Sequence, residues 1–234
     1  SSATTSYAPP AITGLSGLSS FKTNGTDTAL VTITGTNFGP KEATPASPVS
    51  AVYQNAGLSS TYASGEFTAR ECVVSVAHTQ ITCKPAASGA GKDQKWKVTV
   101  GDQQSTASSA TTSYTAPAVT AAFDPAVYST STATPVTITG TNFGVVGATN
   151  AVSATYQNTA LSGLAGSSYT ATGCAVSDAH TKITCTSVAD GVGHALKWMV
   201  TVGDQESAGS SATTSYAPPA ITGLSGLSSF KTNG

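Results

Sequence analysis

Four cysteines, in two pairs of equal spacing, are the residues with the clearest chemistry in this sequence. Cys72 and Cys83 lie eleven residues apart, and so do Cys174 and Cys185. Two such thiols can form a disulfide or, as thiolates, bind a metal such as zinc. In the metal alternative His78 would be a third ligand, but zinc sites generally use tighter pairs of the Cys-x-x-Cys kind. We therefore expect two disulfides, with the metal site as the alternative.

The residues around the first pair predict the hairpin that a disulfide needs. A turn centred on residues 77–78 places Cys72 opposite Cys83 and Val74 opposite Ile81, and the second pair gives the same arithmetic. Opposed residues of antiparallel strands have Cα atoms about 4.5–5.5 Å apart, which is within disulfide range. Ala-His is a poor two-residue turn, so a wider loop is also open. Each disulfide should contribute roughly 2–3 kcal/mol of stability.

The other polar side chains do not form a recognisable catalytic pattern. His78 and His180 occupy equivalent hairpin tips, where we expect solvated turn residues, and His194 has no Ser or Cys partner. Asp102 and Asp204 lie in Gly-Asp-Gln turns and are weak candidates for binding Ca²⁺ near a domain joint. The sequence contains no HExxH, Gly-x-Ser-x-Gly, P-loop or dinucleotide motif. We expect no catalytic residue, no metal and no cofactor, and predict that the protein is not an enzyme.

One modification motif is present. Asn24-Gly25-Thr26 is an N-glycosylation acceptor in a predicted turn. The chain ends on Asn233-Gly234, so a continuing repeat would place the same motif once in every 209 residues. Asn24 is therefore a glycosylation candidate, and the Ser/Thr-rich segments are candidates for O-linked sugar.

These groups must be positioned by strands, and one nine-residue stretch shows how. Residues 31–39 recur unchanged as residues 136–144. Val31 and Ile33 point to one face and the intervening threonines to the other, which is the period of a half-buried strand. Phe38 is the large apolar residue of the turn that follows, and we expect it to fold back into the core. Trp96 and Trp198 lie on apolar strand faces and are predicted to be core residues rather than sugar platforms.

The whole chain is repetitive. Residues 1–7 recur at 108–114 and at 210–216, and residues 210–234 are identical to residues 1–25. The full period is thus 209 residues and holds two related units, which predicts a piece of a longer tandem array. The chain has no initiator Met and no signal peptide, as expected of such a piece. The predicted parts are a last strand of a preceding repeat at 1–8, domains at 9–114 and 115–216, and the start of the next repeat at 217–234.

Composition favours an all-β protein. Charged residues make up 9% of the sequence and the net charge is -1, without the basic clusters of a nucleic-acid-binding protein. No apolar run approaches the 18 residues of a membrane span. About seven short strands per unit, with regular turns, predict a β-sandwich. The short joints, each with proline, predict a semi-rigid rod.

Charge is unevenly divided between the two units. Residues 1–114 hold seven basic and six acidic residues, a net charge of +1, whereas residues 115–216 hold two and five, a net charge of -3. Drift between duplicated copies is one explanation. The other is that unlike units attract when chains pack side by side.

Five segments resemble the IPT/TIG family of immunoglobulin-like domains, and the second unit repeats them. They are Pro10-Ala11-Ile12, Gly35–Gly39, Cys72 with Ile81-Thr82-Cys83, Trp96–Val100 and Ser113-Tyr114. The resemblance implies a β-sandwich and two settings: extracellular arrays, as in plexin-type and fibrocystin-type surface proteins, or domains of transcription factors. The absence of clustered Arg and Lys disfavours the second setting. Paired cysteines favour an oxidising compartment.

The predicted function is therefore structural. We expect the chain to be a repeat of an extracellular or cell-surface fibre whose partners are copies of itself, with other surface proteins possible and neither nucleic acid nor direct membrane insertion. The alternative is the stalk of an adhesin or receptor with its binding domain elsewhere. A further option is that residues 1–8 complete the sandwich of a neighbouring chain by strand addition.

Overall fold

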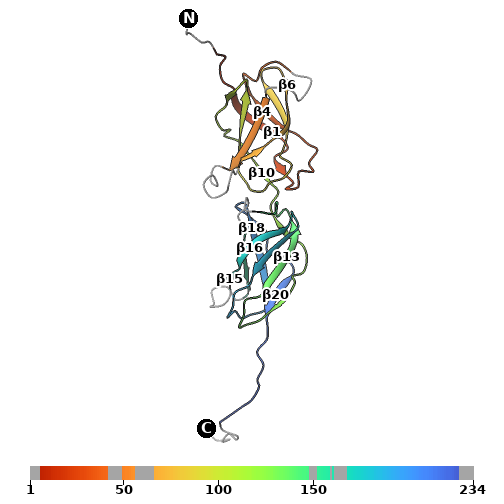
Figure 1. Ribbon diagram of the computed structural model, residues 1–234, viewed down its shortest axis with the longest axis vertical. Coiled ribbons are helices and arrows are strands. Elements are labelled where there is room, and N and C mark those ends of the chain that lie inside the picture. Colours follow the sequence, from red (N-terminus) through yellow and green to blue (C-terminus); the bar gives the residue numbers. More distant parts are fainter. Residues whose placement is uncertain are drawn as a thin grey trace.

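The computed structural model describes residues 6–41, 49–55, 66–147, 152–158, 160 and 168–226. These residues form two β-sandwich domains that follow one another along the long axis of the molecule, with the chain termini at opposite ends (Figure 1). The all-β prediction is confirmed. The described part of the chain contains no helix with the length and hydropathy needed to cross a membrane.

The first domain has two sheets. One has the strand order β1-β3-β7-β6, and the other has the order β2-β10-β8-β4-β5, with β9 paired to β8. The strands are β1 (Ala11–Gly17), β2 (Ser20–Phe21), β3 (Val31–Thr36), β4 (Val49–Asn55), β5 (Glu66–Thr68), β6 (Arg70–Val76), β7 (Gln80–Lys84), β8 (Gln94–Val100), β9 (Gln103–Gln104) and β10 (Thr111–Tyr114).

The second domain repeats this topology strand for strand. Its sheets have the orders β11-β13-β17-β16 and β12-β20-β18-β14-β15, with β19 paired to β18. The strands are β11 (Ala118–Val119), β12 (Val127–Tyr128), β13 (Pro135–Thr141), β14 (Val152–Gln157), β15 (Ser168–Thr170), β16 (Thr172–Asp178), β17 (Lys182–Thr186), β18 (Leu196–Val202), β19 (Gln205–Glu206) and β20 (Thr213–Tyr216).

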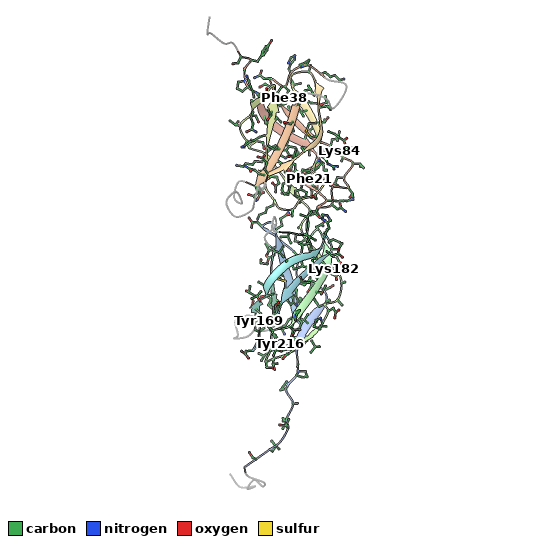
Figure 2. All side chains as sticks on the ribbon, in the orientation of Figure 1. Phe21, Phe38, Lys84, Tyr169, Lys182 and Tyr216 are labelled. Atoms are coloured by element: carbon green, nitrogen blue, oxygen red, sulfur yellow. A yellow bond between two sulfur atoms is a disulfide. The ribbon has the colours of Figure 1, made fainter. Side chains whose placement is uncertain are left out.

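The repeated strand and turn behave as the sequence predicts. Val31 and Ile33 are fully buried, and so is Phe38, which folds back over Gly35. A Cβ atom on Gly35 would collide with the Phe38 ring and with the carbonyl oxygen of Ala11, so glycine is required there. Phe38 fills the N-terminal end of the first core and Phe21 the opposite end (Figure 2).

An aromatic cluster forms the centre of each core. In the first domain Tyr53 stacks on Trp96 with ring centroids 4.4 Å apart, and its hydroxyl is hydrogen-bonded to that of Tyr114 at 2.7 Å. The Trp96 indole N–H donates to Thr112 Oγ1 at 2.8 Å. Burial raises the pKa of Tyr53 to about 12 and raises that of Tyr114 as well, so both phenols stay neutral. Both tryptophans are core residues, as predicted.

The second core repeats these contacts. Tyr156 stacks on Trp198 at 4.3 Å, and its hydroxyl lies 2.7 Å from that of Tyr216. Tyr216 is the last residue of β20, just as Tyr114 is the last residue of β10. In both domains the chain therefore leaves from a tyrosine that is anchored in the core.

The structure joins the cysteines in the predicted pairs. Cys72 is bonded to Cys83 and Cys174 to Cys185, with Cα–Cα distances of 4.2 and 4.1 Å. In the first hairpin Val74 lies opposite Ile81, as the position arithmetic requires. The loop is the wider alternative, three residues long, and its central residue His78 has a φ of 64°. Histidine is among the non-glycine residues enriched in this left-handed region.

The last strand covers only part of the recurring segment 108–114, because β10 begins at Thr111. Before β10, two serines pair with β8 in place of a strand. The backbone N–H of Ser108 donates to the carbonyl of Trp96, and the Ser108 hydroxyl accepts the N–H of Trp96 at 2.9 Å. Ser105 makes the same two bonds with Val98, and its hydroxyl accepts the N–H at 3.0 Å. The second domain has the same arrangement. Side-chain hydrogen bonds to the backbone compete with regular strand pairing.

Replacing Ser108 tests this arrangement. Ser108→Ala leaves the buried N–H of Trp96 without its acceptor, and an unsatisfied buried donor costs about 1–3 kcal/mol. We expect native-state hydrogen exchange of the β3 and β8 amides to show that loss in the first domain. The matched control is Ser109→Ala at the exposed neighbour, which should change stability by less than about 0.5 kcal/mol. Equal effects of the two variants would contradict the arrangement.

Candidate functional site

The candidate chemical groups do not converge. The disulfides lie within each sandwich, Asn24 lies in an exposed turn, and His194 lies at the far end of the second domain. Asp102 and Asp204 occupy two-residue hairpin turns, with φ of 64° and 63°. Across the described ranges, no three His, Cys, Asp or Glu residues are grouped so as to hold a metal ion.

Three long-range side-chain hydrogen bonds meet at the joint between the domains. Tyr114 is buried in the first domain and Pro117 in the second, with two exposed residues between them. The second domain holds this linker through two amide side chains. Gln205 Nε2 donates to the carbonyl of Tyr114 at 2.7 Å, and Asn142 Nδ2 donates to that of Ala116 at 3.2 Å.

Two glycines allow the domains to approach closely. A Cβ atom built on Gly203 would lie 2.8 Å from the Cα atom of Gly91, so neither backbone has room for a side chain facing the other. Ala90 belongs to the first domain by sequence, yet it is 6% exposed and packs in the hydrophobic cluster of the second domain. The apolar contact thus continues across the joint.

A histidine completes the joint and corrects one expectation. His180 was predicted to be a solvated turn residue, but its Nδ1 lies 3.0 Å from the Oγ1 of Thr23, which is 1% exposed. Desolvation lowers the pKa of His180 below its ordinary value. The docked state therefore favours the neutral imidazole.

The joint has two contact surfaces, one on each domain. The C-terminal pole of domain 1 comprises Thr23, Ala90, Gly91 and Tyr114; the N-terminal pole of domain 2 comprises Asn142, Gly144, His180, Val202, Gly203 and Gln205. These residues come from hairpin tips and strand ends of both sheets. The first domain has the equivalent N-terminal pole, namely Asn37, Gly39, His78, Val100, Gly101 and Gln103.

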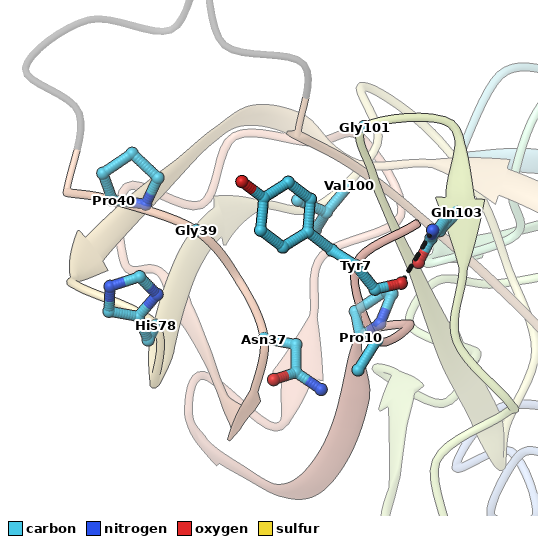
Figure 3. Close-up of a pocket in the computed structure, with 10 residues that line it drawn as sticks. Tyr7, Pro10, Asn37, Gly39, Pro40, His78, Val100, Gly101 and Gln103 are labelled. Carbon is cyan, nitrogen blue, oxygen red and sulfur yellow. Dashed lines mark hydrogen bonds between the residues drawn. The ribbon is translucent and has the colours of Figure 1, made fainter. Parts of the chain in front are cut away.

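The N-terminal pole of domain 1 is an open cavity of about 610 Å³ (Figure 3). It holds the incoming chain in the same way as its counterpart does. Gln103 Nε2 donates to the carbonyl of Tyr7 at 3.0 Å, and Asn37 Nδ2 donates to that of Pro9 at 2.9 Å. Tyr7 reaches across this cavity and is 94% exposed.

The roles of these polar residues were missed in the sequence. Gln103 and Gln205 were identified only as parts of turns, and Asn37 and Asn142 only as parts of the repeated motif. The available signal was that both units keep the same polar residue at equivalent turns. A pairing between His180 and Thr23, 157 residues apart, has no signal in the linear sequence.

The fold and the contacts define a protein of two tandem immunoglobulin-like β-sandwiches with a docked joint. Residues 10–115 match the model of the IPT/TIG domain. This part of the chain is therefore an IPT/TIG domain, and the resemblance in the sequence is confirmed. The second domain has the same strand order and equivalent core residues.

Two solved structures align with most of this chain. The full extracellular region of plexin A4, domains 1 to 8, aligns at 20% identity with a TM-score of 0.36, over 89% of this chain and 18% of that one. The Yersinia pseudotuberculosis adhesin InvE aligns at 13% identity with a TM-score of 0.38, over 82% and 56%. This chain spans less than two thirds of either, and likeness at this level carries no information on function. No curated protein matches the sequence.

The half-buried His180 makes docking depend on pH. Because the pKa of His180 is lowered from 6.5 in the docked state, the undocked state binds more protons at low pH. Docking should therefore be strongest above pH 6.5 and weaken as the pH falls below that value. We expect an NMR titration of the His180 ring to give a midpoint below 6.5.

A pair of matched variants separates docking from local effects. Gly203→Trp blocks the close approach and should return the midpoint toward 6.5. Gly101→Trp introduces the same strain in the equivalent turn, with φ of 53° against 55°, but at the open pole, and should leave the midpoint unchanged. A midpoint at or above 6.5 in the unaltered chain contradicts a desolvated His180.

Proposed function

We propose that this chain is a structural repeat of an extracellular fibre built from tandem IPT/TIG domains. The observation that carries the proposal is that both domains hold the segment entering them with the same two bonds. Gln103 and Asn37 bind the carbonyls of Tyr7 and Pro9, and their equivalents in the second domain bind the linker from the first domain.

Tyr7 supports a preceding domain of the same kind. It is the equivalent of Tyr114 and Tyr216, which are 1% and 3% exposed, whereas Tyr7 is 94% exposed. Burying a tyrosine side chain contributes on the order of 2 kcal/mol, and the phenol needs a partner when buried. A preceding core with its own Tyr–Trp stack supplies both.

The docked joint suits a stiff rod. The two-residue linker, the glycine contact and the shared apolar cluster restrict bending between domains. Disulfides within each sandwich suit an oxidising, extracellular setting. The low charge and the Thr/Ser-rich faces favour close lateral packing of rods, so the proposed partners are further copies of the chain.

The alternative proposal is a stalk. IPT/TIG domains also fit an adhesin or receptor whose binding domain lies outside this segment, and the same rigid joint would then present that domain at a distance. It differs from the fibre in needing no contact between neighbouring chains.

Electron microscopy of the native material distinguishes the two. From strand rise plus loops, one domain should be roughly 35–40 Å long, so one 209-residue period should span about 70–80 Å. Uniform filaments with that axial repeat, or a simple fraction of it, are the expected result. Isolated thin rods that end in a differently shaped head would contradict the fibre proposal and support the stalk.

Asn24 is proposed as a glycosylation site. Its exposed side chain accepts hydrogen bonds from the backbone N–H and the hydroxyl of Thr26, at 3.3 and 2.8 Å, and it follows Thr23 of the joint. We expect peptides with Asn24 from native material to lose a glycan mass on treatment with an N-glycosidase. Peptides covering Asn37, which has no acceptor motif, serve as the control. An unmodified Asn24 peptide contradicts the proposal.

A further inference from the structure

We propose that the C-terminal pole of domain 2 and the N-terminal pole of domain 1 are the two halves of a second joint, so that domain 2 of one copy docks onto domain 1 of the next. The C-terminal pole of domain 2 comprises Thr130, Val192, Gly193 and Tyr216. This inference rests on the proposed tandem array and names the partner of each open pole.

The joint between domains 1 and 2 serves as the template. At the N-terminal pole of domain 2, Val202 is 1% exposed and Gly203 is buried against the first domain. At the equivalent pole of domain 1, Val100 is half-buried and Gly101 is exposed, with nothing within 4 Å of its built Cβ atom. The residues are the same, and the difference is the presence of a docked neighbour.

The opposite pole shows the same contrast. In domain 1, Thr23 is 1% and Ala90 is 6% exposed because domain 2 covers them. In domain 2 their equivalents are uncovered: Thr130 is exposed and Val192 is 57% exposed. The positions correspond because Gly91 and Gly193 accept the same hydrogen bonds, from Tyr114 and Tyr216, each at 2.8 Å.

Both open poles already have the docked backbone conformation. The φ angles of Asn37, Gly39 and His78 are 63°, 82° and 64°, against 62°, 79° and 65° at the docked pole of domain 2. At the other end Gly91 and Gly193 have φ of 108° and 115°. Docking would therefore need no rearrangement of either backbone, which keeps its entropic cost low.

The substitutions between the two poles are compatible with docking. Val192 replaces Ala90 and presents a larger apolar side chain, and the cavity of about 610 Å³ at the domain 1 pole is lined in part by Val100 and Pro40. His78 would face Thr130 as His180 faces Thr23. Among the described residues, no charged side chain lines that cavity apart from the titratable His78, so docking would desolvate no fixed charge of the described part there.

The sequence identifies the occupant as another copy of this chain. Residues 210–234 are identical to residues 1–25, so the segment that leaves domain 2 is the segment that enters domain 1. Tyr216-Ala217-Pro218-Pro219 corresponds to Tyr7-Ala8-Pro9-Pro10, whose carbonyls Gln103 and Asn37 already bind. Two exposed residues again separate the anchored tyrosine from Pro10, which is buried.

The test uses a chain of two periods, residues 1–216 followed by residues 8–234, which preserves the natural junction because residues 210–216 are identical to residues 1–7. Spin labels on Ser109→Cys and Ser211→Cys report distances across joints, since both serines are exposed and the native cysteines are disulfide-bonded. The reference pair is 109 and 211 of one copy. The test pair is 211 of the first copy and 109 of the second.

We expect pulsed electron spin resonance to give the test pair a distance distribution as narrow as that of the reference pair. Val192→Asp in the first copy places a charge in the apolar contact and should broaden the test distribution while leaving the reference unchanged. Ala175→Asp adds the same charge at an exposed position of β16, away from both poles, and should leave both distributions narrow.

Two results overturn the proposal. A broad test distribution in the unaltered two-period chain means that the poles do not dock. A narrow distribution that Val192→Asp leaves unchanged means that the Pro-Pro linker alone sets the geometry. Neither measurement requires filaments. The second joint can therefore be disproved without contradicting the proposed fibre, and an absence of filaments in native material would count against the fibre alone.

Discussion

The burial of the last tyrosine of each domain is the constraint on which the rest of the structure depends. Tyr114 and Tyr216 end the closing strands, and their hydroxyls are hydrogen-bonded in the core to Tyr53 and Tyr156. Because the chain is anchored where it leaves one domain, the linker is short and the next domain begins within a few residues. The close glycine contact between Gly91 and Gly203 follows from that short linker.

The poles are built from turns that need left-handed backbone. Asn37, His78 and Asp102 all have positive φ, and each lies at the tip of a turn at the same end of the first domain. Small or polar residues tolerate this conformation, so small and polar side chains line much of the open pole. That surface lets another backbone approach, while its amide side chains hold the linker. The same turn chemistry therefore closes the sheets and forms the contact surface.

The composition has a structural use in this fold. Serine hydroxyls such as those of Ser105 and Ser108 accept the backbone N–H groups of β8 that a regular strand would otherwise pair. With polar groups satisfied locally and few ion pairs among the described residues, the sandwich needs little charge. In the proposed fibre, rods with such faces would pack end to end and side by side with little desolvation cost.

The sequence by itself determined the fold class, the 209-residue period, the core residues Phe38 and Trp96, and the pairing of the cysteines. These properties follow from local rules: the alternation of a strand, the spacing of a hairpin and the repetition of a segment. Tertiary structure alone decided the start of the closing strand at Thr111, because Ser108 satisfies β8 with its side chain. It also decided the joint, because the contact of His180 with Thr23 depends on how two folded domains meet, which no periodicity in either unit encodes.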